Sequence, residues 1–310
     1  MSRSEAENRT PSYIALYESG ELARRIEALE AILTSCTLCP RGCRVDRTRG
    51  ETGVCRAGAA AMVSSASPHF GEEPPLVGSG GSGTIFMTHC NLRCVFCQNY
   101  DISQEVGTWR GEEVGPEELA GVMIALAGRG CHNINIVSPT HYVPQVVAAL
   151  PFAVEKGLDL PLVYNTGGYD SIEVVRLLEG IFDIYMPDYK FTDSRPAERY
   201  MNAPDYPEVI QDILREMHRQ VGTLRTDDAG IAYRGLLIRH LVMPNDAAGT
   251  AEAMEFIATE LSSDSYVNVM QQYHPMYRAG DFPEIARRLS LEEYLDAVWA
   301  ARRAGLSRGF

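Results

Sequence analysis

The sequence predicts an α/β fold built around a largely parallel sheet. Six short runs rich in β-branched and aromatic residues alternate with six patterns of helical spacing along residues 83–304. Most of these runs are apolar over much of their length, as strands covered by helices are. Such units form either an open doubly wound sheet or a partial barrel, and periodicity alone does not separate the two.

The expected elements follow one another as short strands and longer helices. The runs expected to form strands cover residues 83–88, 133–138, 160–165, 182–186, 236–243 and 266–270. The helical patterns cover residues 116–127, 143–156, 170–178, 206–221, 250–261 and 291–304. The alternation of strand and helix is that of parallel βα units.

A further helix is expected near the N-terminus, over residues 13–33, where apolar residues recur near helical spacing. A stretch rich in glycine and proline at residues 68–83 predicts a loop. We therefore expect an N-terminal appendage over residues 1–79, containing this helix and a group of cysteines, and a main domain over residues 80–310.

The composition is that of an ordinary soluble globular protein, with 45% hydrophobic and 22% charged residues among 310. The sequence contains no apolar stretch of membrane-spanning length, and the first residues lack the apolar core of a secretory signal. We therefore expect a cytoplasmic protein without a membrane partner. The formal net charge of −13, with scattered Lys and Arg, argues against nucleic acid as a partner.

Seven of the eight cysteines fall into two groups along the chain. In a long chain without an export signal, such grouping predicts metal or cluster ligation and not a disulfide framework. The remaining one, Cys131, precedes a predicted strand and is most simply a small core residue.

The second group has the spacing C-x3-C-x2-C and consists of Cys90, Cys94 and Cys97, directly after the first predicted strand. Soft thiolates match iron, and three of them on one loop suit a cubane cluster with one iron left open for chemistry. The alternative is a zinc knuckle or an electron-transfer cluster. Either would need a fourth ligand, which Cys131 or an N-terminal cysteine could supply.

This spacing, with an aromatic residue just before the last cysteine, resembles the radical S-adenosylmethionine (SAM) superfamily. The run CNLRCVFCQNYDIS is similar to its pyruvate formate-lyase activating enzyme-like branch, and to members with an extra N-terminal cysteine motif. The resemblance implies a partial (β/α)6 barrel of the TIM type, a [4Fe–4S] cluster that binds SAM, and a 5′-deoxyadenosyl radical. It also implies an electron donor such as a flavodoxin or ferredoxin.

The ends of the next two predicted strands supply candidate SAM-binding residues, because ligands of α/β folds sit at the carboxyl ends of strands. Ser138 and Thr140 stand where superfamily members often carry a Gly-Gly-Glu turn, and turn or N-cap roles are the alternative. Asn165 and Thr166 stand where activating enzymes carry an Asp-Thr-Asn-Gly pattern. Asn165 keeps an oxygen ligand there but lacks the charge.

The last three strand ends add four further candidates. Asp188 and Lys190 resemble the family's Asp-x-Lys pattern, where the carboxylate would hold the ribose or an amino group and the ammonium would pair with the methionine carboxylate. A surface ion pair is the alternative. Arg239 and His274 match a family Arg and His near SAM. Arg239 shares a strand face with Leu241, and His274 could instead be a core histidine.

The first cysteine group has the spacing C-x2-C-x3-C-x11-C and consists of Cys36, Cys39, Cys43 and Cys55. Four thiolates can close a zinc site or a second Fe–S cluster, and the Gly and Pro among them permit tight ligand turns. Substrate binding, redox use and buried thiols remain as alternatives.

The leading hypothesis is an activating-enzyme-like oxidoreductase that cleaves SAM reductively and abstracts a hydrogen atom from a substrate. The substrate is either a glycyl radical enzyme, a small molecule or another protein. A second hypothesis is a non-catalytic Fe–S electron carrier or metal-binding module, with a fully ligated cluster and no SAM site. A third, an RNA-modifying enzyme, uses the same chemistry but requires a basic face.

Overall fold

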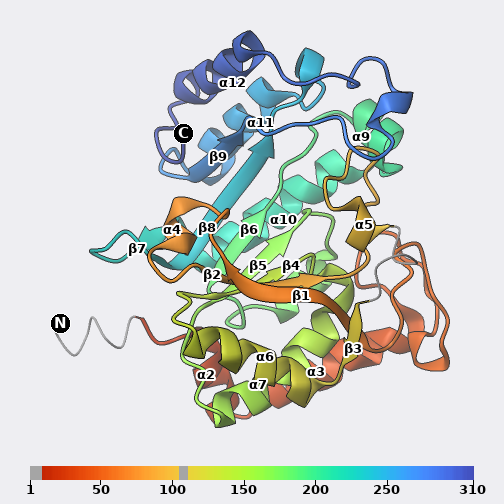
Figure 1. Cartoon of the computed structure of the whole chain (residues 1–310), viewed down its shortest axis with the longest axis vertical. Helices are drawn as coiled ribbons and strands as arrows, with labels where there is room; N and C mark the ends of the chain where they lie inside the picture. The colour runs from red at the N-terminus through yellow and green to blue at the C-terminus, as the bar shows by residue number, and fades with distance from the viewer. Residues whose placement is uncertain (1–8, 105–110) are drawn as a thin grey trace.

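The computed structural model describes residues 9–104 and 111–310, and nine strands within them form one sheet (Figure 1). The strands are β1 (Ala61–His69), β2 (Ser82–Met87), β3 (Glu112–Val114), β4 (Ile134–Val137), β5 (Leu162–Thr166), β6 (Ile184–Pro187), β7 (Arg225–Thr226), β8 (Ala232–Leu241) and β9 (Tyr266–Met270).

The sheet has the order β3-β1-β2-β4-β5-β6-β8-β7, with β9 also paired to β8. The pairs β2–β4, β4–β5, β5–β6, β6–β8 and β8–β9 are all parallel. No ladder among the described strands joins β9 to β2, so the barrel is not closed. The predicted α/β fold with a parallel-rich sheet is confirmed.

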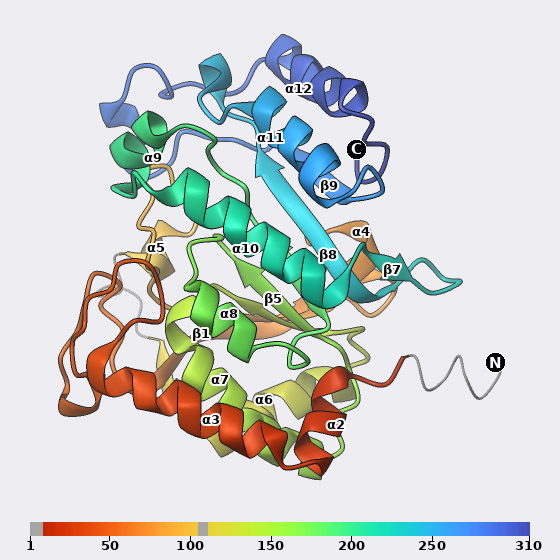
Figure 2. The ribbon, with the colours of Figure 1, turned by 180° about the vertical axis from the view of Figure 1, so that it is seen from behind.

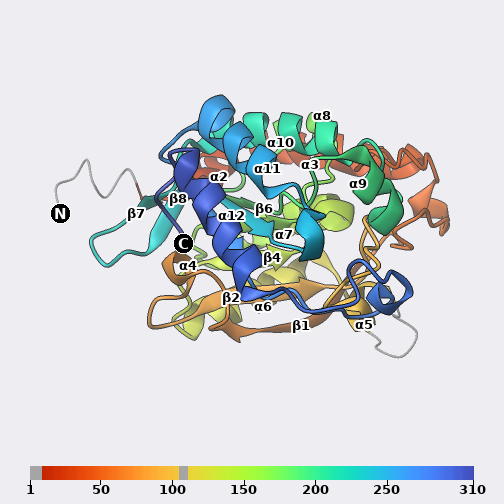
Figure 3. The ribbon, with the colours of Figure 1, turned by 90° about the horizontal axis from the view of Figure 1, so that it is seen from above.

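Most of the helices cover the outside of this sheet, whereas α4 packs on its concave side. The helices are α2 (Ser12–Glu18), α3 (Glu21–Ala31), α4 (Pro74–Val77), α5 (Tyr100–Ser103), α6 (Pro116–Gly128), α7 (Val143–Glu155), α8 (Ile172–Leu177), α9 (Ser194–Met201), α10 (Tyr206–Val221), α11 (Thr250–Phe256) and α12 (Leu291–Arg303). Figure 2 shows α8, α10 and α11 in front of the sheet, on the side away from β1. The view from above in Figure 3 agrees.

The helix boundaries follow local sequence signals. The longest helix, α10, has Pro207 in its first turn and ends at Gly222, whose backbone is left-handed (φ 70°). Its buried face carries apolar residues at helical spacing, among them Ile210, Leu214 and Met217. The last helix, α12, begins with a capping box between Ser290 and Glu293.

The concave side of the sheet is divided between an apolar and a polar part. Leu76 of α4 packs there in a small cluster of inward-facing strand residues, with Val163, Ile184, Met186 and Leu237 among them. The short helix α4 therefore fills one part of the partial barrel. Polar side chains gather where the parallel strands end, and this arrangement leaves a cavity at that edge.

The N-terminal segment differs from the single expected helix. Two helices, α2 and α3, replace it because Gly20 between them takes a left-handed backbone (φ 75°). The Ser12 backbone N–H and hydroxyl both donate to Asp183 Oδ1, at 3.0 and 2.7 Å, and tie α2 to the sheet. The domain boundary between residues 79 and 80 stays a prediction.

Two other expectations differ from the structure in detail. The stretch 68–83, expected as a loop, contains the end of β1, the helix α4 and the start of β2. The helix expected over 250–261 is α11 followed by a π-helical turn, Ile257–Leu261. No helix of the described residues has the length and apolar character needed to span a bilayer.

Tyr13→Phe tests how strongly α2 holds the sheet. The buried Tyr13 hydroxyl lies 3.0 Å from the Leu160 carbonyl and 3.3 Å from the Leu158 carbonyl. Its loss leaves carbonyls without a donor, so urea titration should show a loss of about 1 kcal/mol in the free energy of unfolding. Tyr17→Phe, which removes a solvent-exposed bond to Glu155, is the control and should change this energy by less than about 0.5 kcal/mol. Equal losses of unfolding free energy in the two variants would contradict the role of the Tyr13 hydroxyl in holding α2 to the sheet.

Candidate functional site

The carboxyl ends of the parallel strands line one cavity of about 380 Å³, here called the strand-end cavity. The ladders align the strands so that Val137 pairs with Asn165, Asp188 with Arg239, and Leu241 with Met270. In each of these aligned strands every second side chain therefore points to the concave side of the sheet, where they meet. The lining from the strands and their ends includes Phe86, Val137, Ser138, Asn165, Thr166, Asp188, Lys190, Arg239, Leu241 and Met270.

The loop after β2 brings Cys90, Cys94 and Cys97 to the same cavity. Two residues of this loop, His89 and Arg93, have left-handed backbones (φ 67° and 57°), which lets the chain turn tightly between the cysteines. The His89 N–H donates to the Ile102 carbonyl at 2.9 Å, and the Val95 N–H donates to the Tyr200 carbonyl at 2.9 Å. These two hydrogen bonds hold the loop at His89 and at Val95 through contacts within the protein itself.

The environment of the sulfurs suits thiolate ligands. The Leu92 N–H donates to Cys90 Sγ at 3.4 Å, and the Ser103 hydroxyl lies 3.3 Å from Cys97 Sγ. Burial raises the pKa of Cys94 and of Cys97, so both thiols keep their protons near neutral pH until a metal displaces them. The nearby Lys190 ammonium opposes this effect at both sulfurs.

Asp188 lies between the two cations of the cavity. Its carboxylate is 2.6 Å from Lys190 Nζ through one oxygen and 2.7 Å from Arg239 Nε through the other. Burial opposes ionisation, but Arg239 and Lys190 outweigh it and hold the pKa of Asp188 below its usual range. Arg239 also donates to Asn165 Oδ1 at 2.8 Å. The alternative of a surface ion pair is wrong, because these side chains are largely buried.

Two acidic residues that the sequence patterns did not single out join this network. Glu72 lies 3.7 Å from Arg239 Nη1, and Glu73 lies 3.9 Å from Arg239 Nε. Burial raises the pKa of Glu72 to about 7, with Arg239 opposing the shift. Glu73 is buried and accepts from Asn268 at 3.0 Å through Oε1, whereas its Oε2 has no partner among the described residues.

A buried carboxylate, that of Asp170, accepts hydrogen bonds from side chains at the end of β5 and next to it. Asp170 accepts hydrogen bonds from the hydroxyls of Thr140, Tyr164 and Thr166, each at 2.7 Å. Thr140 is itself buried and does not line the cavity, so the structure places it as a support for Thr166. Its predicted role as a SAM ligand stays a prediction.

The other predicted residues are placed as follows. Ser138 lines the cavity with a left-handed backbone (φ 58°), and its N–H donates to the Asn165 carbonyl at 2.8 Å. His274 is half-buried and does not line the cavity. His240 faces away from the cavity, as strand alternation predicts, and bonds the Tyr189 carbonyl at 2.8 Å. Roles for Ser138 and His274 in SAM binding remain predictions.

The four N-terminal cysteines line a second, small and largely enclosed cavity, here called the N-terminal cysteine cavity. Neither they nor Cys131 line the strand-end cavity, so none completes the set of Cys90, Cys94 and Cys97 from there. The chain therefore has two separate cysteine groups. One consists of Cys36, Cys39, Cys43 and Cys55, and the other lies on the C-x3-C-x2-C loop.

The donor set of the strand-end cavity fits an Fe–S cluster. Cys90, Cys94 and Cys97 are free thiols that face one space. Across the described ranges, no three His, Cys, Asp or Glu side chains converge as ligands of a single metal ion. A cubane cluster does not require such convergence, because each protein sulfur binds a different iron.

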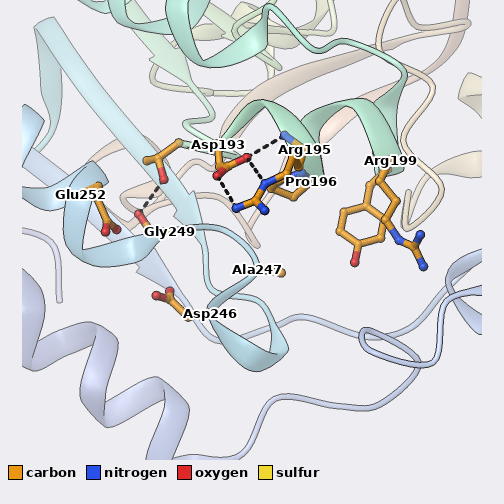
Figure 4. A pocket seen from close by; sticks show the side chains of 10 residues that line it. Asp193, Arg195, Pro196, Arg199, Asp246, Ala247, Gly249 and Glu252 are labelled. Atoms are coloured by element: carbon orange, nitrogen blue, oxygen red, sulfur yellow. Dashed lines mark hydrogen bonds and ion pairs between the residues drawn. The ribbon is translucent and has the colours of Figure 1, made fainter.

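A wider hollow lies between α9 and the loop after β8 (Figure 4). Its volume is about 550 Å³, larger than the strand-end cavity, but it is shallow and open. Its arginines are already paired, Arg195 with Asp193 at 3.3 Å and Arg199 with Glu284 at 2.6 Å. No cysteine of the described residues lines it. We therefore place the chemistry in the strand-end cavity.

Similarity to known proteins agrees with this choice. Residues 84–227 match the Radical SAM superfamily, a range that includes the C-x3-C-x2-C loop and the strands β4, β5 and β6. The chain belongs to the radical SAM superfamily. Membership implies a [4Fe–4S] cluster and SAM as cofactors, with SAM cleaved at the cluster.

Relatives of this radical SAM protein extend the match over most of the chain. The uncharacterized protein MJ0674 of Methanocaldococcus jannaschii is 33% identical over 292 residues, which cover 91% of this chain and 78% of the relative. The uncharacterized protein MJ0808 of the same organism is 24% identical over 305 residues, 90% of this chain and 84% of the relative. A crystal structure of a radical SAM methyltransferase from Sphaerobacter thermophilus matches with a TM-score of 0.48 and 14% identity, over 73% of this chain and 65% of that one.

Asp170→Asn tests the support behind β5. An amide offers one acceptor oxygen in place of two, so one of the three hydroxyls loses its acceptor. Chemical denaturation of the metal-free protein should show a loss of about 2 kcal/mol in unfolding free energy. Glu173→Gln, an exposed acid nearby, is the control and should change little. Two equal losses would contradict a supporting role for Asp170.

Glu72→Gln tests the raised pKa of Glu72. The folded state holds this proton up to about pH 7, and the unfolded chain loses it near pH 4.5. Folding therefore takes up a proton between these values, and stability falls as pH rises through that window. The metal-free variant should gain about 2 kcal/mol relative to the parent between pH 5 and pH 8 in urea titrations. The exposed control Glu255→Gln should show no such change with pH. A Glu72→Gln difference that is the same at both pH values would exclude the raised pKa.

Proposed function

We propose that this protein is a radical SAM enzyme in which Cys90, Cys94 and Cys97 hold the [4Fe–4S] cluster and the strand ends bind SAM. The observation that carries the proposal is that the three thiols and the Asp188 network line one cavity. A plain electron carrier would need a fourth thiolate and has no use for buried charges beside the cluster. The cysteines outside this loop do not line this cavity.

Held by Cys90, Cys94 and Cys97, a reduced [4Fe–4S] cluster would supply the one-electron chemistry that cleaves the sulfonium bond of SAM to a 5′-deoxyadenosyl radical. The protein's own part is to position and to shield. Asp188 holds Lys190 and Arg239 in place, so their remaining N–H groups can bind the methionine carboxylate. Of the two acids beside Arg239, Glu72 lines the cavity and suits the amino group or the sulfonium, which are both cationic.

Within the superfamily, we place the chain in the pyruvate formate-lyase activating enzyme-like branch. The run CNLRCVFCQNYDIS and the Asp-x-Lys pattern at Asp188 and Lys190 support this placement. The reaction proposed is abstraction of a carbon-bound hydrogen atom by the radical. The substrate classes are a glycyl radical enzyme, whose target is a protein glycine, and a small molecule. Deuterium transfer from a labelled candidate into 5′-deoxyadenosine distinguishes them.

Cys94→Ala tests the cluster assignment. Loss of the most buried of the three ligands should remove the SAM-dependent change in the electron paramagnetic resonance spectrum of the reduced, reconstituted protein. Formation of 5′-deoxyadenosine should fall by at least about 100-fold. Cys131→Ala, a buried cysteine outside the cavity, is the matched control and should keep both signals. Undiminished 5′-deoxyadenosine in Cys94→Ala would overturn the assignment.

A further inference from the structure

The four N-terminal cysteines line one common cavity. Cys36, Cys39, Cys43 and Cys55 come from two turns that are 11 residues apart in sequence, yet they line one small cavity and none is in a disulfide. Gly53 is required at the second turn, because a Cβ there would lie 2.7 Å from Cys43 Sγ. The loops are therefore built to bring these sulfurs together.

A buried cation beside this cavity points to a negatively charged occupant. Arg47 lines the cavity and is only 1% exposed, and its guanidinium donates to the carbonyls of Gly58 and His141. No carboxylate of the described residues lies within ion-pair distance of it. A buried guanidinium without a counter-ion is costly. A centre with four thiolate ligands carries net negative charge and would supply that counter-ion.

An unpartnered nitrogen lies at the same cavity. His141 Nε2 lies 2.7 Å from the Thr88 carbonyl, so this nitrogen carries the proton. Nδ1 is then a bare acceptor, and it has no partner among the described residues although His141 is buried. His141 is one of the residues that line the N-terminal cysteine cavity, so this cavity is bordered by a residue whose buried acceptor has no partner among the described residues.

The two cysteine groups are separated by one residue of the C-x3-C-x2-C loop. Burial raises the pKa of Cys39 and the nearby Asn91 side chain opposes this shift, while Asn91 Oδ1 is 4.0 Å from Cys90 Sγ. Arg41, between two N-terminal cysteines, donates to the Asn91 carbonyl at 3.1 Å. A redox centre at the first group would therefore lie directly behind the cluster loop.

The surface over the first group has the opposite charge to the rest of the protein. Residues 36–57 carry five arginines against Asp46 and Glu51, a local net charge of +3 in a chain of net charge −13. Arg44, Arg49 and Arg56 are exposed. These loops lie at the edge of the molecule beside α5, which follows the cluster loop (Figures 1 and 2). Such a face complements an acidic protein.

We propose that Cys36, Cys39, Cys43 and Cys55 hold a second Fe–S cluster, through which an acidic one-electron carrier protein reduces the SAM cluster. One electron passes from the carrier to the N-terminal site and then to the site at Cys90. The carrier is oxidised by one electron, the SAM cluster is reduced by one, and the N-terminal site returns to its starting state. In this transfer no covalent bond forms or breaks, and no proton moves. The inference rests on the proposed function for the SAM cluster. The site is proposed to hold iron because zinc has no redox chemistry and could not carry the electron.

The metal is tested in a variant that lacks the SAM cluster. C90A/C94A/C97A, reconstituted anaerobically, should retain about four irons and four sulfides per chain, with thiolate-to-iron absorption. C36A/C39A/C43A/C55A should lose these four irons and sulfides and keep those of the cluster at Cys90, Cys94 and Cys97. One zinc per chain in C90A/C94A/C97A, or no metal at all, would overturn the proposal. The proposed function would stand in either case, because it concerns the other three cysteines.

The electron path is tested by comparing two reductants. Reduction of the SAM cluster, followed by its electron paramagnetic resonance signal, should be at least about tenfold slower with reduced flavodoxin in C36A/C39A/C43A/C55A. Dithionite, which is small and reaches the open strand-end cavity directly, should reduce both proteins equally. Unchanged rates with flavodoxin, or a parallel fall with both reductants, would overturn the path.

A second variant keeps all seven ligands. R44E/R49E/R56E reverses the exposed charges only, and should slow reduction by flavodoxin at low salt without affecting dithionite or iron content. Reduction by flavodoxin at the parent rate would exclude this face as the entry point.

Discussion

The geometry of the strand-end cavity depends on one buried carboxylate, that of Asp188. Each of its oxygens holds one cation, Lys190 on the same loop and Arg239 on the neighbouring strand. Without Asp188 two buried positive charges would repel each other, and neither would have a fixed position. Because Arg239 also bonds Asn165, three strands are joined at their carboxyl ends by charge-assisted bonds where backbone pairing stops.

This network decides how the cavity can receive a ligand. The two cations face Asp188, Glu72 and Glu73, so the site is close to neutral or slightly negative depending on the proton of Glu72. SAM carries two positive groups and one carboxylate. Entry of such a cation favours ionisation of Glu72, whereas the carboxylate must share N–H groups that already bond Asp188. On the proposed function, this charge balance favours a zwitterionic cation over a simple anion.

Much of this site could be predicted from the sequence because its residues lie at the ends of apolar runs. Asp188 and Lys190 follow a recognisable strand and Arg239 lies near the end of another, and parallel ladders bring such ends together. Glu72 and Glu73 could not be found this way, since they lie in the loop before α4, and of the two only Glu72 lines the cavity. The strand β1 was missed because its residues are mostly small and polar, and its pairing with β2 depends on a distant partner. Thr140 was placed correctly at a strand end, yet its direction is set by Asp170, which no local pattern reveals.

The spacing of the N-terminal cysteines predicts a ligand set but not its location. Their place behind the cluster loop is fixed by Arg41, which spans to the carbonyls of Asn91 and Met201, and by the buried Arg47 with His141. These contacts bond backbone carbonyls, which any residue offers, so sequence alone carries no trace of them. They make the N-terminal loops part of the wall that shapes the C-x3-C-x2-C turn. The two cysteine groups are therefore held in direct contact through these loops, despite the 34 residues between Cys55 and Cys90.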